Sequence, residues 1–168
     1  AHRQGLAVTP IKDSNMTERF SQSLRRQSEP TWSAAVGHRF VTQLCDGSLP
    51  APIMVDYLVQ DHRFLDSFLT LLGAAIATAD TFEARLRFGR FAGMISSDEN
   101  TYFLHAFEAL DVSPAQRTEP ADTAPTAGFK AIMREAAATR SYAAALAVLN
   151  VAEGLYLDWA LKLSLIHI

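Results

Sequence analysis

Apolar side chains recur at steps of three and four residues along most of the chain, which is the spacing of one buried face of an α-helix. The first clear series contains Trp32, Val36 and Phe40. The pair Glu29-Pro30 interrupts the helical pattern just before this series. Because proline has no backbone N–H to donate, the interruption predicts a break or a kink at that point.

A strong turn signal, Asp-Gly-Ser-Leu-Pro, occupies residues 46–50. It combines a helix-ending glycine, a capping serine and a proline suited to the start of a helix. A second long helix is therefore expected to begin near Pro50 and to end at about Ala79. The apolar stripe of this helix contains Met54, Tyr57, Leu58, Leu65, Phe68 and Leu72.

The second half of the chain predicts further helices separated by a proline-rich connection. Residues 80–81 (Asp-Thr) can cap a third helix, and residues 96–98 (Ser-Ser-Asp) either continue that helix or cap a successor. Residues 112–128 contain three prolines and are expected to form a surface connection. Helices are expected over 129–139 and 141–163. No alternating β-type run occurs, so the chain is predicted to be all-α, with about five to seven helices.

The composition indicates one globular domain. Of the 168 residues, 49% are hydrophobic and 20% are charged, which is typical of a chain with a substantial core. Residues 1–15 mix Gly, Pro and polar types without a period, so we expect a loose leader there and a single helical domain over 16–168. The formal net charge of -3, with scattered Lys and Arg, argues against a nucleic-acid partner.

The cysteine and histidine content predicts neither a disulfide nor a metal cluster. A single cysteine, Cys45, favours a reducing compartment and a cytoplasmic location. The histidines lack metal-cluster spacing, so no metal and no cofactor are expected; a haem ligated by His38 is the alternative. The longest nearly uncharged runs, 67–79 and 142–152, are shorter than the roughly 18 residues that span a bilayer, so no membrane partner is expected.

Two acidic residues occupy positions where hydrophobic residues are expected. Asp61 follows Tyr57 by four positions and precedes Leu65 by four, so it lies on the apolar face of the second helix. Glu153 follows Leu149 by four positions and lies on the apolar face of the last helix. Because charged groups are rarely buried without a partner, both positions are candidates for function.

The chemistry of such carboxylates leaves two interpretations open. Burial raises the pKa of a carboxyl group toward values useful for proton transfer, and a nearby donor keeps it ionised for holding an amino group or ring nitrogen. Two inward carboxylates walled by aromatic rings therefore suit a flat, nitrogen-rich ligand. In the alternative interpretation, each is a structural acid bonded to a helix end or to an arginine.

The order of several short motifs resembles the TenA family, also called thiaminase II. The most specific part is the turn at 46–50 followed about ten residues later by Gln-Asp at 60–61. Weaker matches continue to the last helix. The matching segments are Trp32, His-Arg-Phe at 38–40, Tyr-Leu-Val-Gln-Asp at 57–61, Phe-Leu at 64–65, Ser-Asp-Glu at 97–99, Pro-Thr-Ala at 125–127 and Gly-Leu-Tyr-Leu-Asp-Trp at 154–159.

The resemblance implies a haem-oxygenase-like multi-helix bundle, often a homo-oligomer (dimer or tetramer), that hydrolyses thiamin or an aminomethylpyrimidine in thiamin salvage. By the same resemblance, Asp61 holds the amino group and ring nitrogen of the pyrimidine, and Phe64 and Phe129 stack on its ring. Tyr57 and Tyr156 complete the expected substrate-binding set.

Departures from the family pattern sharpen these expectations. The position of the family's nucleophilic cysteine corresponds to Val151, so the chain resembles the branch in which a glutamate of that helix stands in for catalysis. Glu153 is the candidate, and Asp61 is its expected catalytic partner. Phe64 and Phe129 replace what are often tyrosines.

The C-terminal segment is the largest departure. Family chains continue through further helices that carry another tyrosine and a glutamate treated as the general acid, whereas residues 163–168 are an apolar tail. This difference predicts a truncated or frameshifted chain, an open pocket and an apolar face that favours oligomerisation. A non-catalytic pyrimidine-binding or regulatory protein is the alternative function.

Overall fold

The computed structural model describes residues 19–166, and for residues 163–166 only the backbone. The expected leader at residues 1–15 lies outside the described residues, as does the end of the apolar tail at 167–168. Every regular element within 19–166 is helical, which confirms the all-α prediction. The elements are α1 (Phe20–Gln27), α2 (Thr31–Val36), α3 (Arg39–Cys45), α4 (Ala51–Thr78), α5 (Phe82–Met94), the π-helical turn η1 (Ile95–Glu99), α6 (Asn100–Ala109), α7 (Pro114–Thr118), α8 (Ala124–Ala138) and α9 (Tyr142–Ile166).

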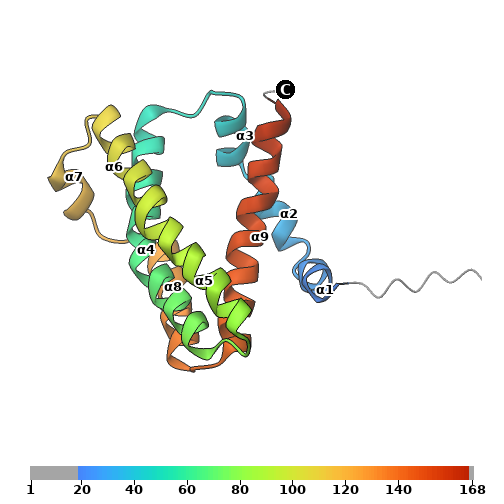
Figure 1. The fold of residues 1–168 in the computed structure, drawn as a ribbon. Coiled ribbons are helices and arrows are strands. Elements are labelled where there is room, and N and C mark those ends of the chain that lie inside the picture. Colours follow the sequence, from blue (N-terminus) through green and yellow to red (C-terminus); the bar gives the residue numbers. More distant parts are fainter. Residues whose placement is uncertain (1–18, 167–168) are drawn as a thin grey trace, which may run out of the picture.

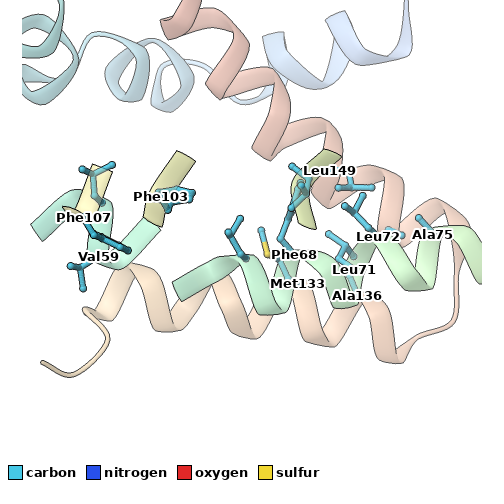
Figure 2. Close-up of a cluster of buried hydrophobic side chains, with 14 of the residues drawn as sticks. Val59, Phe68, Leu71, Leu72, Ala75, Phe103, Phe107, Met133, Ala136 and Leu149 are labelled. Carbon is cyan, nitrogen blue, oxygen red and sulfur yellow. The ribbon is translucent and has the colours of Figure 1, made fainter. Parts of the chain in front are cut away.

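Helix α4 is the centre of the bundle. Its 28 residues contact α5, α6, α8 and α9, while α2 and α3 lie beside α9 (Figure 1). The buried core follows one side of α4 and is completed by α6, α8 and α9 (Figure 2). Its most deeply buried large side chains are Phe68, Leu71, Leu72, Phe107 and Met133.

The predicted course of α4 is confirmed at both ends. Gly47, just after α3, has the positive φ of 73° that the turn at 46–50 requires. Pro50 is the N-cap of α4, and the helix ends at Thr78. Ser48 does not cap α4, because its hydroxyl and its backbone N–H both donate to Asp46 instead. The turn therefore stops one helix and starts the next, as the sequence predicts.

Two expectations, one about the number of helices and one about where they begin, were wrong. Within residues 19–166 there are nine α-helices rather than five to seven, partly because the series from Trp32 breaks again at Gly37, between α2 and α3. The connection expected over 112–128 contains α7 and the first turn of α8. Pro114 and Pro125 start these helices, because the first turn needs no N–H from the residue that proline occupies.

The close approach of α9 to α2 depends on Gly154. A Cβ atom at this position would lie 2.9 Å from Cη2 of Trp32, whose side chain is buried. The indole Nε1 donates to Asp158 on α9 at 2.8 Å, and Arg25 forms an ion pair with the same carboxylate at 2.8 Å. The small residue and the polar contacts together fix the N-terminal helices against α9.

Substituting Gly154 with alanine is expected to destabilise the protein by about 1–2 kcal/mol, because the clash with Trp32 outweighs the gain in helix propensity. Thermal unfolding should show a melting temperature lower by roughly 3–6 °C. The matched control is Gly73→Ala in α4, where an added Cβ meets no atom within 4 Å and stability should stay equal or rise. An equal response of the two variants would contradict the packing role of Gly154.

Helix α9 is apolar over much of its exposed surface. Among the described residues, its 21-residue segment Tyr142–Lys162 is long and apolar enough to cross a membrane, by length and composition only. This finding differs from the expectation drawn from the shorter uncharged runs. Its exposed apolar residues include Leu146, Val151, Leu157 and Leu161. A dimer or tetramer that covers them stays a prediction.

Candidate active site

Helices α4, α8 and α9 bring the six predicted site residues to one cavity of about 340 Å³. On α4, Tyr57, Asp61 and Phe64 follow one another at steps of four and three residues, which places them on one face. The cavity is lined by Tyr57, Gln60, Asp61, Phe64, Pro125, Thr126, Phe129, Ala152, Glu153 and Tyr156. Two carboxylates that are 92 positions apart in the sequence thus face the same space.

Aromatic rings form one wall of this cavity. The ring centroids of Phe64 and Phe129 are 5.9 Å apart with an interplanar angle of 40°, and Phe68 supports Phe64 edge-on at 5.6 Å. A flat ring held between two others needs them about 7 Å apart, twice an ordinary carbon contact distance. The two rings are therefore too close to admit a ligand ring between them, and they form one aromatic wall on which a flat ring can stack.

Asp61 is poised to exchange a proton near neutral pH. Burial raises the pKa of its carboxyl group to about 6, and a hydrogen bond from the Tyr57 hydroxyl partly offsets this rise. Burial and the neighbouring Asp61 raise the pKa of Tyr57 above its usual range, so this hydroxyl remains a donor. The side chain of Asp61 forms no ion pair among residues 19–162, which disagrees with the structural-acid interpretation.

Glu153 lies at the rim of the cavity. Much of the residue is exposed, yet its carboxyl group is desolvated enough that burial, together with the charge of Glu99, raises its pKa. Burial, Asp61 and Glu99 raise the pKa of the nearby Tyr156 to about 12, so its hydroxyl stays protonated. A carboxyl group that keeps contact with water and has a raised pKa suits proton transfer to or from a water molecule.

Glu99 is a third acidic residue that the sequence analysis did not assign to the site. It lies in a second cavity of about 340 Å³ that shares Tyr57, Asp61 and Tyr156 with the first. Burial, and then the charge of Asp61, raise the pKa of Glu99. Helical spacing in the sequence did not indicate Glu99, because this residue ends the π-helical turn η1. That turn shifts the side-chain register between α5 and α6 relative to a continuous α-helix.

A larger apolar cavity of about 770 Å³ lies on the other side of Tyr57. It extends between α2, α3, α4 and α9 and includes His38, Phe40 and Trp159. Among the residues that line this larger cavity, Asp56 carries the carboxylate. Asp61 and Glu153 both line the first cavity of about 340 Å³ instead. Because acid-base chemistry needs groups that converge on one point, the smaller cavity is the candidate active site.

Comparison with known proteins identifies relatives of this architecture. The model of the TENA/THI-4/PQQC family matches residues 25–167. The crystal structure of a TenA family transcription regulator from Silicibacter sp. TM1040 superimposes with a TM-score of 0.79 at 25% identity, over 86% of this chain and 64% of that one. A Schizosaccharomyces pombe protein named as a hydroxymethylpyrimidine/phosphomethylpyrimidine kinase is 31% identical over 67 residues, which are 40% of this chain and 12% of that protein. The chain thus spans less than two thirds of the length of either relative.

Proposed function

The chain belongs to the TENA/THI-4/PQQC family, and from this membership and the geometry of the cavity we propose that it hydrolyses a thiamin-related aminopyrimidine. The observation that carries the proposal is the convergence of Asp61 and Glu153 on one ring-walled cavity. The name of the Schizosaccharomyces pombe relative, which refers to hydroxymethylpyrimidine, supports a pyrimidine as the ligand.

Asp61 orients the pyrimidine. A protonated carboxyl group donates to a ring nitrogen and accepts from the adjacent amino group, whereas an ionised carboxylate accepts from both the protonated ring nitrogen and the amino group. Because the pKa of Asp61 is about 6, both proton arrangements are accessible near neutral pH. Phe64 and Phe129 then hold the ring by stacking, which is favourable for any flat heteroaromatic ring.

Glu153 moves the protons of hydrolysis. Its carboxylate takes a proton from a water molecule as the water oxygen attacks the exocyclic carbon of the pyrimidine. The bond from that carbon to the leaving amine breaks, and Glu153 returns the proton to the departing nitrogen. With an aminomethylpyrimidine the products are a hydroxymethylpyrimidine and ammonia. With thiamin the thiazolium nitrogen leaves as neutral thiazole and needs no proton, so the products are a hydroxymethylpyrimidine and the thiazole, and Glu153 releases its proton to solvent.

Calorimetric titration with an aminomethylpyrimidine and with thiamin, followed by chromatographic detection of the hydroxymethylpyrimidine product, tests the proposal. Binding with turnover supports hydrolysis. Binding without product supports a non-catalytic pyrimidine-binding or regulatory protein, a candidate favoured by the name of the Silicibacter relative. Absence of binding at saturating ligand overturns both.

The charge of Glu99 is expected to set the acidic limb of the pH-rate profile. Burial is the larger cause of the raised pKa of Glu153 and the charge of Glu99 adds to it, so Glu99→Gln should lower that pKa and move the acidic limb to lower pH. Steady-state rates measured from about pH 5 to 8 give the shift. Glu108→Gln, a change at an exposed position of α6, serves as the control, and an equal shift in both variants would contradict the coupling.

A further inference from the structure

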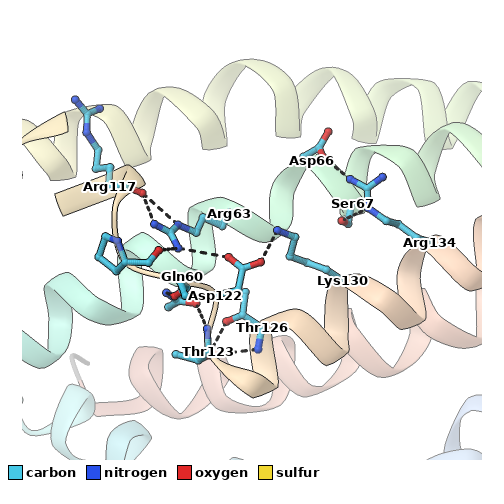
Figure 3. Close-up of polar contacts among 12 residues, drawn as sticks. Gln60, Arg63, Asp66, Ser67, Arg117, Asp122, Thr123, Thr126, Lys130 and Arg134 are labelled. Atoms are coloured by element: carbon cyan, nitrogen blue, oxygen red, sulfur yellow. Dashed lines mark hydrogen bonds and ion pairs between the residues drawn. The ribbon is translucent and has the colours of Figure 1, made fainter. Parts of the chain in front are cut away.

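The side chain of Gln60 joins α4 to the start of α8 through both ends of its amide group (Figure 3). Its Oε1 accepts from the backbone N–H of Thr123 at 2.9 Å, and its Nε2 donates to the carbonyl oxygen of Ala121 at 3.3 Å. The partners are more than sixty positions away in the sequence. A two-point contact of this kind fixes orientation as well as distance, because an amide group has its donor and acceptor at fixed positions.

The backbone that Gln60 holds determines where α8 begins. Thr123 is the N-cap of α8, and its hydroxyl accepts from the backbone N–H of Thr126 at 3.4 Å. Pro125 and Thr126, in the first turn, line the candidate active site, and Phe129 follows one turn later. Gln60 therefore contacts the backbone at the start of the helix that carries the Phe129 ring.

Gln60 also directly precedes Asp61 and lines the same cavity. One turn of α4 thus carries both the carboxylate and the amide that holds the opposite wall. The Phe64 and Phe129 rings, whose centroids are 5.9 Å apart, form one wall of that cavity, and Phe129 is carried by the helix whose start Gln60 holds. A change of about 1 Å in the position of the first turn of α8 would decide how well a flat ring is held.

We propose that Gln60 is a positioning residue that places the Phe129 part of the aromatic wall beside Phe64 by holding the first turn of α8 against α4. The inference rests on the proposed function, because the aromatic wall matters only for a ring ligand. Gln60 itself takes no part in bond making or breaking. Its effect is on the fit of the ring and not on the proton transfers of Glu153, which lies on α9.

Arg63 supports a neighbouring part of the same connection. Its guanidinium donates to the carbonyl oxygens of Arg117 and Pro120 and pairs with Asp122, which also binds Lys130 at 2.7 Å (Figure 3). These contacts hold the connection between α7 and α8, at residues that do not line the candidate active site. Arg63 is a poor choice for the test, because its removal frees several carbonyl groups at once.

Arg134 provides a matched control for the effect of holding α8 against α4 at a distance from the candidate active site. It also joins α8 to α4, since its Nε donates to Ser67 at 3.0 Å and its guanidinium pairs with Asp66 (Figure 3). The contact lies farther along both helices, and neither Arg134 nor its partners line the candidate active site. Gln60→Met removes a pair of polar contacts between α4 and the backbone that leads into α8, and Arg134→Met removes a pair between α4 and α8 itself; both keep an unbranched side chain.

Calorimetric titration of wild type, Gln60→Met and Arg134→Met with an aminomethylpyrimidine tests the inference. Gln60→Met should raise Kd and KM by about tenfold and leave kcat within about threefold, because Glu153 is not displaced. Arg134→Met should leave all three constants within about twofold of wild type. Thermal unfolding should show that both variants are folded.

The possible outcomes distinguish a failure of the Gln60 inference from a failure of the proposed function. If wild type binds the pyrimidine and Gln60→Met binds it equally well, the positioning role of Gln60 is wrong and the proposed function stands. If Arg134→Met weakens binding as much as Gln60→Met, general tethering of α8 explains the effect and the inference is again wrong. If wild type binds no aminopyrimidine, the proposed function is overturned and the inference with it.

Discussion

Replacing Asp61 with leucine is expected to abolish aminopyrimidine binding and, at the same time, to raise the stability of the protein near pH 8. The substitution removes both polar contacts with the pyrimidine, which together correspond to a loss in affinity of about 100-fold or more. It also removes a carboxylate that is ionised at a largely buried position. A loss of binding combined with a gain in stability is typical of a residue kept for function.

The direction of the stability change follows from the pKa of Asp61, which burial raises from 3.8 to about 6 in the folded protein. The stability contributed by this group is present below its unfolded pKa and is lost as the pH rises through about 6. Near pH 8 the ionised carboxylate costs at most about 3 kcal/mol, or 1.36 kcal/mol for each unit of pKa. Because Tyr57 loses its acceptor, we expect a net gain of about 1–2 kcal/mol, or roughly 3–6 °C in melting temperature.

Calorimetric titration and thermal unfolding at about pH 4, 6 and 8 check this prediction together. The stability advantage of Asp61→Leu should shrink as the pH falls from about 6 to 4. Asp56→Leu is the control, because Asp56 is an exposed carboxylate of the same helix that does not line the candidate active site. A destabilised Asp61→Leu protein with unchanged binding would identify Asp61 as a structural acid.

Glu153→Gln is expected to reduce turnover by about 10²–10⁴-fold while leaving pyrimidine affinity within about threefold of wild type. Glutamine keeps the size of the side chain and most of its polarity, but it cannot take a proton from water. Because Asp61, Phe64 and Phe129 provide the binding contacts, Kd should change little. The effect should therefore fall on kcat and on kcat/KM equally.

Single-turnover kinetics and calorimetry on the same preparation separate the two constants. The pKa of Glu153 is raised by burial and by Glu99, so wild-type turnover should fall as the pH drops through that raised pKa, when the base is protonated. The residual rate of Glu153→Gln should lack this limb. Equal turnover in wild type and variant, with the same pH profile, would remove Glu153 from the mechanism.

The sequence predicted the long central helix and singled out Asp61 and Glu153 for physical reasons that are local. Asp61 is largely buried, whereas Glu153, expected on the apolar face of the last helix, is exposed at the cavity rim. The turn at 46–50 uses residues with specific backbone preferences, and these preferences hold in any tertiary context. Asp61 and Glu153 were found because helical spacing alone shows which residues share a face. That both line one cavity could be expected only from the family resemblance, since their helices are distant in the chain.

The features that were missed depend on tertiary context or on irregular geometry. Pro125 was taken as part of a connection, because a proline favours either a loop or the first turn of a helix and only packing decides between them. Glu99 was missed because the π-helical turn changes the side-chain register. Gln60 was visible as part of a Gln-Asp motif, but its partners are backbone groups of a distant connection, and backbone groups leave no mark in the sequence.

A crystal structure of the protein soaked with an aminomethylpyrimidine tests the central claim most directly. The account predicts a ring stacked on Phe64 and Phe129, with its amino group and ring nitrogen at Asp61 and its exocyclic carbon facing Glu153. Empty density beside Asp61 at saturating ligand, or a ring seated in the larger apolar cavity near His38 and Trp159, would contradict it.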